Sequence, residues 1–458
     1  MILVLPLLPL FTSVLISLMY KGKVHCLLTS IGSALIGLIG IYGLTGWKEE
    51  VVVFKFVFST LSFNINFLSS LFCLIVGFVG LASSIYSASR SPGLWGLYSL
   101  FLSSMYLVLL VEDAFWFMFF WEIMTLTSYF LILYGGDSAG KAGFKYFVMT
   151  HIGSGCILLS ILLVFRKCET LDFSFASLTS ASSSLSTLEL TVCLALIVAG
   201  FAVKSGLLPF HYWLPDTYSC APASVTALLS GASSKVAVYG LLLFSTRVFP
   251  IERLVGFAVA SLGALSMMLG GLYAVKQGRA RRLLAYSSIE NMGVVGVGLG
   301  LGGYGSVYAL FHLVNHSLLK SAAFFSVGNI EVSSNSGVNR VSGVIGVSRL
   351  LSFSMISSAF FLAGFPPSSM FLSKLGVLCE TARFKLLLML YAFFSFISLA
   401  ALTYRFMEAC MGVSSELKKP VPLLSAVSLA LVVVSIVLGV FPAPALEVIS
   451  RVSSWLGG

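Results

Sequence analysis

The chain has 458 residues, of which 58% are hydrophobic and only 10% are charged. Soluble globular proteins carry about 25% charged residues, so this composition, with a mean hydropathy of +1.02, excludes a soluble enzyme, a disordered chain and a disulfide scaffold. A net charge of +10 would suggest nucleic acid as the partner of a soluble protein, but here it is typical of basic loops at the cytoplasmic face of a membrane.

Apolar segments separated by charged residues, glycine or proline follow one another along the whole chain. A bilayer span needs about 20 apolar residues, so there is room for about 14 helical spans and little room for a soluble domain. We predict an all-α polytopic membrane protein with spans over 2–19, 24–45, 64–87, 93–111, 114–134, 143–165, 188–208, 222–246, 255–275, 283–301, 305–328, 349–379, 386–411 and 421–441. No basic region precedes the first span, so we do not interpret it as a cleaved signal peptide. Two longer loops are predicted, a Ser-rich surface loop over 172–187 and another over 329–347.

Prolines interrupt the seventh and the twelfth predicted spans. The first break reads KSGLLPFHYWLPD from Lys204 to Asp216, and the second reads GFPPSSMFLSK from Gly364 to Lys374. Proline removes a backbone donor, and inside a bilayer the freed carbonyls must meet protein or water. Paired broken helices in the two halves of a transporter indicate its ion path. We therefore predict two inverted five-helix repeats with discontinuous helices 7 and 12.

The predicted organisation has four parts. Helices 1–3 occupy residues 1–92, the first repeat (helices 4–8) 93–248, the second repeat (helices 9–13) 249–411, and C-terminal helix 14 lies in 412–458. Lys and Arg are more frequent in the odd-numbered connections, with a dense cluster at 276–282. This bias predicts that those connections face the cytoplasm and that both termini lie outside it. The expected location is the plasma membrane of a prokaryotic cell, with the mitochondrial inner membrane as the alternative.

Titratable residues inside the spans are the candidate functional residues, because an ionised side chain at the membrane centre costs about 2.5–3.5 kcal/mol. The predicted relay comprises Glu122 in span 5, Lys204 in span 7, Lys235 in span 8, His312, His316 and Lys320 in span 11, and Lys374 in span 12. The three residues of span 11 are spaced by four and share one helix face. The structural alternatives are that lysines near helix ends extend to the interface and that Glu122 is a protonated core acid.

These residue types suit proton transfer. A carboxylate beside a lysine stabilises both as ions, and histidine changes its charge near neutral pH, so a row of such groups can pass protons sideways within the membrane. The accessory candidates are His151, His211, Asp216, Glu290 and Asn291.

The eight cysteines form no C-x-x-C pair, and no phosphate-binding loop motif occurs, so we predict no metal site and no cofactor on this chain.

The block FAVKSGLLPFHYWLPDTYSCAPASVTALLSGASSKVAVYGLLLF at 201–244 resembles the antiporter-like subunits of the complex I superfamily. These include the chain 4 type subunit of NADH:quinone oxidoreductase, membrane subunits of membrane-bound NiFe hydrogenases and formate hydrogenlyase, and D-type subunits of multisubunit sodium/proton antiporters. The resemblance runs from about 60 to 410 and implies the fold of two inverted five-helix repeats. It also implies that Glu122 and Lys204 form an ion pair, that Lys235 bridges the halves, and that the span 11 relay ends at Lys374.

Within the superfamily, local sequence favours the hydrogenase branch. LLAYSSIENMG at 283–293 places Asn291 where chain 4 subunits tend to carry histidine, and FHLVNHSLLKS and FFWEIMTLTSYF also look closer to the hydrogenase branch. The asparagine would leave a gap in the relay for water or Glu290 to fill. The resemblance thus implies a proton- or sodium-translocating membrane subunit of a redox-driven ion pump.

The expected partners follow from the same resemblance. They are further antiporter-like subunits, small helical subunits, and a redox arm that carries Fe–S clusters and NiFe or flavin, so any oxidoreductase activity would belong to the complex. Two alternatives stay open. One is a subunit of a multisubunit cation/proton antiporter driven by an ion gradient without redox chemistry, and the other is a non-pumping structural membrane subunit.

Overall fold

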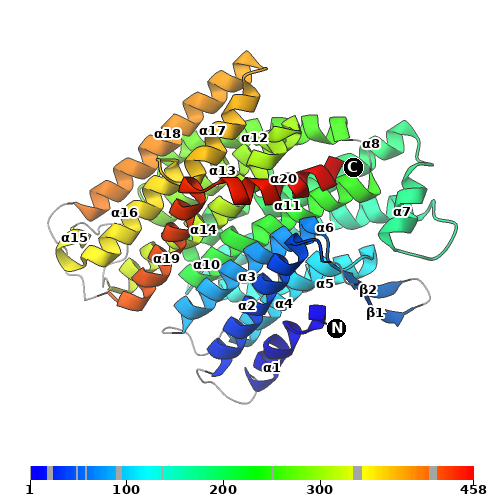
Figure 1. Ribbon diagram of the computed structural model, residues 1–458, viewed down its shortest axis with the longest axis horizontal. Coiled ribbons are helices and arrows are strands. Elements are labelled where there is room, and N and C mark those ends of the chain that lie inside the picture. The colour runs from blue at the N-terminus through cyan, green and yellow to red at the C-terminus, as the bar shows by residue number, and fades with distance from the viewer. Residues whose placement is uncertain are drawn as a thin grey trace.

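The structure, a computed structural model, is a bundle of long helices that lie side by side (Figure 1). It describes residues 2–17, 24–47, 50–56, 59–88, 95–136, 138–249, 252–333, 343–411 and 420–457. In the described part, nine helical stretches are long and apolar enough to cross a membrane. This agrees with an integral membrane protein, because a span of about 20 apolar residues matches the bilayer core.

The first half of the chain contains the elements up to residue 248. These are η1 (Ile2–Val4), α1 (Leu7–Ser17), α2 (Val24–Leu44), β1 (Glu50–Lys55), β2 (Thr60–Asn64), α3 (Phe67–Ser87), α4 (Trp95–Leu110), α5 (Ala114–Leu133), α6 (Ala139–Phe165), α7 (Phe175–Ser182), α8 (Thr187–Ser205), η2 (Phe210–Trp213), α9 (Leu214–Cys220), α10 (Ala223–Leu228), η3 (Leu229–Ser233), α11 (Ser234–Leu243) and η4 (Phe244–Val248).

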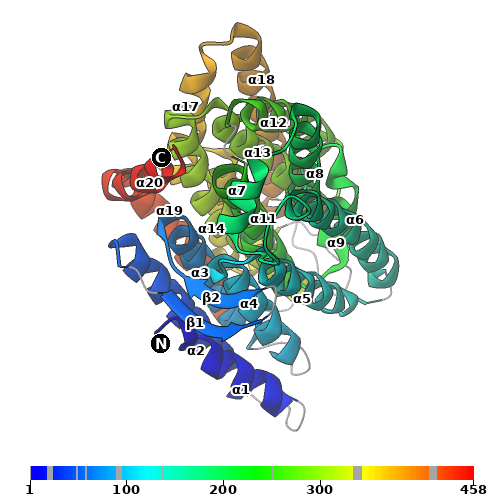
Figure 2. The same ribbon diagram turned by 90° about the vertical axis from the view of Figure 1, so that its right-hand side faces the viewer.

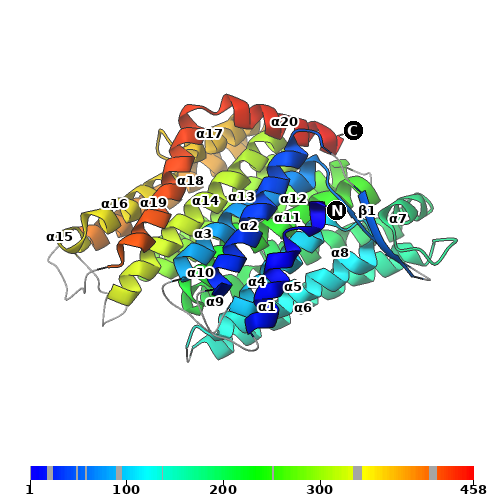
Figure 3. The same ribbon diagram turned by 60° about the horizontal axis from the view of Figure 1, so that its bottom comes forward.

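The second half contains the remaining helices. These are α12 (Glu252–Val275), α13 (Ala280–Leu301), α14 (Tyr304–Ser333), α15 (Val344–Val347), α16 (Arg349–Ala363), α17 (Ser369–Thr381), α18 (Lys385–Cys410), α19 (Pro422–Val440) and α20 (Ala443–Gly457). Figure 3 shows that α20 runs in a different direction from α19, which precedes it.

Helix covers most of every predicted span, but four details differ from the sequence prediction. The antiparallel hairpin β1–β2 departs from an all-helical fold, because a run of β-branched and aromatic residues at 51–54 favours a strand. The predicted loop 172–187 contains α7, whose N-cap Ser174 accepts the backbone N–H of Ser177. Part of the loop predicted at 329–347 is helical, since α14 extends to Ser333 and α15 begins at Val344, while 334–342 lie outside the described residues. Finally, α20 is an additional helix after α19.

Both predicted breaks are present and share one local feature. The helix α8 ends at Ser205, and its C-cap Gly206 has a φ of 78°. The helix α16 ends at Ala363, and its C-cap Gly364 has a φ of 103°. Glycine takes this left-handed conformation without steric cost and commonly ends helices in this way. The chain then continues into η2 and α9 after the first break, and into α17 after the second.

The helix α14 lies inside the bundle (Figure 2). It packs against α10, α13, α16, α17 and α19. Because it has neighbours on several sides, nearly all of its residues between 309 and 330 are buried, including its histidines and lysine. The polar face predicted for span 11 therefore lies within the protein and not against lipid.

Candidate functional site

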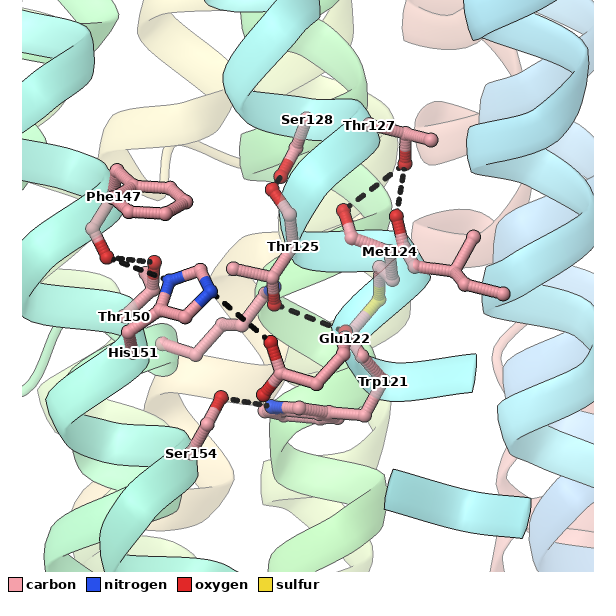
Figure 4. A network of polar contacts seen from close by, with 12 residues as sticks. Trp121, Glu122, Met124, Thr125, Thr127, Ser128, Phe147, Thr150, His151 and Ser154 are labelled. Carbon is pink, nitrogen blue, oxygen red and sulfur yellow. Dashed lines mark hydrogen bonds and ion pairs between the residues drawn. The ribbon is translucent and has the colours of Figure 1, made fainter. Parts of the chain in front are cut away.

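Glu122 lies midway along α5 and faces α6 (Figure 4). Its Oε2 atom is 3.3 Å from Nε2 of His151. Nδ1 of the same ring is 2.9 Å from the Phe147 carbonyl, and because a carbonyl only accepts, Nδ1 carries a proton. His151, predicted as an accessory residue, is therefore the direct partner of the Glu122 carboxyl group.

The start of α5 is held by Asp113, whose side chain accepts the backbone N–H groups of Phe115 and Trp116. The backbone N–H of Thr60 in β2 also contacts this carboxylate, at 3.4 Å. Burial raises the pKa of Asp113 to about 6, although these hydrogen bonds act in the opposite direction. The N-cap therefore anchors the helix that carries Glu122 and joins it to the hairpin.

Lys204 is buried in the last turn of α8, just before the break. Its Nζ donates to Oγ1 of Thr125 at 2.7 Å and lies 5.1 Å from the ring centroid of Trp121. Trp121 and Thr125 are one turn apart on α5 and share the face that meets Lys204, whereas the Glu122 carboxylate turns toward α6 (Figure 4). The direct Glu122–Lys204 ion pair implied by the resemblance is therefore not formed among the described residues.

Lys235 is fully buried at the start of α11, directly after the π-helical turn η3. Its Nζ donates to the carbonyl of Ser230 and to Oγ of Ser234, the latter at 3.3 Å. It also lies 2.7 Å from Nδ1 of His316 on α14. Because an ammonium group only donates, His316 accepts through Nδ1 while Lys235 is charged. Wide helical turns of this kind often occur at functional sites.

The polar face of α14 continues from this contact. The rings of His316 and His312 are stacked, with centroids 6.2 Å apart, and Nδ1 of His312 is 2.9 Å from Oγ of Ser373 on α17. Among the described residues, the Nε2 atoms of both rings are buried without a hydrogen-bond partner, and such atoms commonly bind water. Lys320 donates to the carbonyl of Leu284 and to Oγ of Ser287, both on α13.

Lys374 has a partner that the sequence analysis named only as an accessory residue. Its Nζ is 3.1 Å from Oε1 of Glu290, and Glu290 is fully buried near the middle of α13. Oγ of Ser398 donates to the other carboxylate oxygen at 3.3 Å, and the hydroxyl of Tyr391 donates to the Lys374 carbonyl at 3.1 Å. The sequence signal for this pair is a single acidic residue inside an otherwise apolar span.

The other accessory residues take different positions. Asp216 is 38% exposed and pairs with Lys145 at 2.9 Å and with Arg282 at 3.3 Å, away from the other candidate residues. Nδ1 of His211 is buried without a partner in the described structure. Asn291 donates to the carbonyl of Ser287 at 2.6 Å, so it contacts the same residue that holds Lys320.

The structure also adds residues that sequence analysis missed. Four short hydroxyl side chains each contact one titratable group, namely Thr125, Ser287, Ser373 and Ser398. Serine and threonine are frequent throughout the chain, so only their contacts distinguish these four. Within the described ranges, no group of three His, Cys, Asp or Glu side chains is arranged to hold a metal ion.

A family model described as "NADH:quinone oxidoreductase/Mrp antiporter, TM" matches residues 112–400. The matched range includes every residue of the predicted relay, from Glu122 to Lys374. Hydrogenase-4 component B of Escherichia coli strain K12 is 32% identical over 299 residues, which cover 60% of this chain and 44% of that protein. NADH-quinone oxidoreductase subunit N of Desulforudis audaxviator strain MP104C is 31% identical over 320 residues, which cover 66% of this chain and 62% of that protein. Each match spans less than two thirds of the relative.

A solved structure has the same fold over nearly the whole chain. A chain in the structure of the Mrp complex from Dietzia sp. DQ12-45-1b superimposes with a TM-score of 0.90, covering 99% of this chain and 97% of that chain. The two sequences are 21% identical, so the likeness concerns the fold alone.

Proposed function

Because the chain belongs to the NADH:quinone oxidoreductase/Mrp antiporter transmembrane family, we propose that it is the ion-translocating subunit of a complex I-like, redox-driven pump. We assign it to the membrane-bound hydrogenase branch, with H+ or Na+ as the ion. The observation that carries this proposal is the set of ionisable side chains inside the helical spans, of which six are buried and Glu122 is one third exposed. Such groups are costly inside a membrane and typically mark an ion path.

These side chains provide proton donors and acceptors on α5, α8, α11, α14 and α17. The proposed relay comprises Glu122, Lys204, Lys235, His312, His316, Lys320 and Lys374. Its central contacts are the 2.7 Å distance from Lys235 to His316 and the 2.9 Å distance from His312 to Ser373. Imidazole can accept a proton at one nitrogen and donate from the other, so the two rings are suited to carry protons between α11 and α17.

The assembly around this chain is also part of the proposal. The partners would be further antiporter-like subunits, small helical subunits and a redox arm with Fe–S clusters and NiFe or flavin, and electron transfer would supply the energy.

We further propose two inverted repeats over 93–248 and 249–411, flanked by 1–92 and 412–458. Residues 89–94 and 412–419, which contain two of these boundaries, lie outside the described part. Both termini would lie outside the cytoplasm of a prokaryotic cell.

A gradient-driven antiporter is the second candidate function. The fold match to a chain of the Mrp complex supports it, whereas the 32% identity to hydrogenase-4 component B supports the redox-driven pump. In an antiporter, the inward flow of one ion would drive the other outward without a redox arm. A structural subunit without translocation is disfavoured, because it would keep the costly buried charges without a use for them.

Purification of the native complex tests the proposal. The complex would be isolated in mild detergent, its subunits identified by mass spectrometry, and the whole reconstituted into vesicles with a pH-sensitive dye. We expect a hydrogenase-type large subunit, Fe–S proteins and electron donor-dependent acidification or alkalinisation of the lumen. Copurification of small antiporter subunits alone, with cation exchange that needs no electron donor, would replace the pump with the antiporter.

A further inference from the structure

We propose that Glu290 is a second carboxylate of the translocation relay and that it forms, with Lys374, a charge gate shielded from water. This inference rests on the proposed function and adds a residue and a step to it. Lys374 and Glu290 are 3.1 Å apart, and none of the Glu290 surface is exposed. A buried carboxylate needs a partner because desolvating a lone charge is costly, so the ion pair is a required part of this site.

Neighbouring helices close the site on several sides. Ser398 and Tyr391 of α18 hydrogen-bond to the carboxylate and to the Lys374 backbone, respectively. On the α12 side, a Cβ atom added to Gly270 would lie 2.6 Å from the backbone nitrogen of Glu290. The glycine thus lets α12 pack directly onto α13 at this residue. The helices α12, α13, α17 and α18 therefore surround the pair, and the Glu290 carboxylate has no surface exposed.

The position of Glu290 in the chain corresponds to that of Glu122. In the predicted repeats, α5 and α13 are the second helices of their units, and the broken helices that carry Lys204 and Lys374 are the fourth. Each half therefore combines an acid on an unbroken helix with a lysine beside a break, and each break follows a glycine of positive φ. The second half thus contains a full acid–lysine site, rather than a lysine alone.

The proposed step conserves protons and charge. An incoming proton binds the Glu290 carboxylate, which becomes a carboxylic acid and leaves the Lys374 ammonium without its counter-ion. The buried ammonium is then destabilised and releases its proton to the far side, becoming a neutral amine. Transfer of the Glu290 proton to this amine restores the ion pair. One proton has entered, one has left, and no electrons have moved.

The test compares Glu290→Gln, Glu290→Asp, Lys374→Met and the double variant Glu290→Gln/Lys374→Met in the reconstituted complex. Glu408→Gln is the matched control, because Glu408 is exposed on α18 and pairs only with Arg405 among the described residues. We expect Glu290→Gln to lower translocation by roughly 10-fold or more, since general acid–base groups contribute at least that much. Glu290→Asp should retain part of the rate, and Glu408→Gln all of it.

Melting temperature provides a readout that does not depend on transport. Glu290→Gln and Lys374→Met should each melt lower than wild type because each leaves one buried charge unpaired, and the double variant should recover part of the loss. If Glu290→Gln fails to assemble, the double variant replaces it in the transport assay. Wild-type translocation in Glu290→Gln, with Lys204→Ala inactive, would overturn the role of Glu290 and leave the proposed function intact. Wild-type translocation in the double variant, with Lys204→Ala inactive, would overturn the role of Glu290 and also remove Lys374 from the proposed relay. Wild-type translocation in Lys204→Ala as well would overturn the proposed function itself.

Discussion

The two acid–lysine sites of this protein use similar residues in different surroundings. In the first half, Glu122 is 33% exposed and contacts His151, while Lys204 contacts Thr125 and the Trp121 ring. In the second half, Glu290 is fully buried and contacts Lys374 directly. The first site is thus partly open at the surface of this chain, whereas the second is enclosed by its own helices.

The positions of the two lysines explain the difference. Lys204 lies in the last turn of α8, where the negative end of the helix dipole stabilises a cation, and an aromatic ring within about 6 Å adds to this. Lys374 lies in the first half of α17, where the dipole gives no such help. Because it is nearly as buried, it depends on a carboxylate as its counter-ion. Helix position and burial thus account for the different partners of the two lysines.

The largest expected effect comes from removing Lys235, the residue proposed to connect the two acid–lysine sites. Lys235→Ala removes the amine that lies 2.7 Å from His316, so we expect translocation to fall by about 100-fold or more while the complex still assembles. The measurement is donor-driven ion uptake in reconstituted vesicles. Arg405→Ala is the control, because Arg405 lies at the surface of α18. Full activity of Lys235→Ala would mean that the two sites do not communicate through α11.

The difference in burial predicts a difference in stability. Glu290→Gln leaves the Lys374 ammonium unpaired in the interior, at a cost of about 3–5 kcal/mol in the free energy of unfolding. Glu122→Gln keeps a side-chain amide that can still hydrogen-bond to the His151 ring at this partly exposed contact, so we expect a smaller loss of stability. Melting temperatures of the two purified variants provide the measurement. Equal losses of stability would contradict the contrast between an open and a shielded site.

A smaller effect is expected from the hydroxyl that holds Lys204. Thr125→Val removes the acceptor at 2.7 Å and keeps the side-chain shape, so the loss should be about 0.5–1.5 kcal/mol, or a few-fold in translocation rate. Thr127→Val is the control, since the Thr127 hydroxyl bonds only to the Ile123 and Met124 carbonyls of its own helix in the described structure. Similar rates in both variants would show that Lys204 does not need Thr125.

A further expected effect concerns the pH dependence of the α5 N-cap. Burial raises the pKa of Asp113 from 3.8 to about 6, so its protonated form is favoured by folding. Its contribution to stability is complete below the unfolded pKa and is lost as the pH rises through about 6. Asp113→Asn keeps a good N-cap and cannot ionise. The melting temperature of wild type, relative to this variant, should therefore fall between about pH 4 and pH 7, and a constant difference would argue against a buried, titrating Asp113.

Sequence analysis located the candidate residues better than their partners. Lys204, Lys235, His316 and Lys374 were identified from charges inside apolar runs, because the cost of burying a charge is visible in composition alone. His151 was placed among the accessory residues, although it holds the Glu122 carboxylate. Its role depends on how α5 and α6 pack, and a lone histidine in an apolar helix has no pattern that reveals this.

The sequence by itself determined that this is a helical membrane protein, where its helices break, and which spans carry charge. These are local properties, set by hydropathy, proline and glycine. Only the tertiary structure decided that Lys204 contacts Thr125, that Glu122 contacts His151, and that Glu290 on α13 pairs with Lys374 on α17. Such contacts join residues far apart in the chain. They depend on how whole helices pack and on the direction of each side chain. A buried charge pairs with whichever group this packing brings within reach.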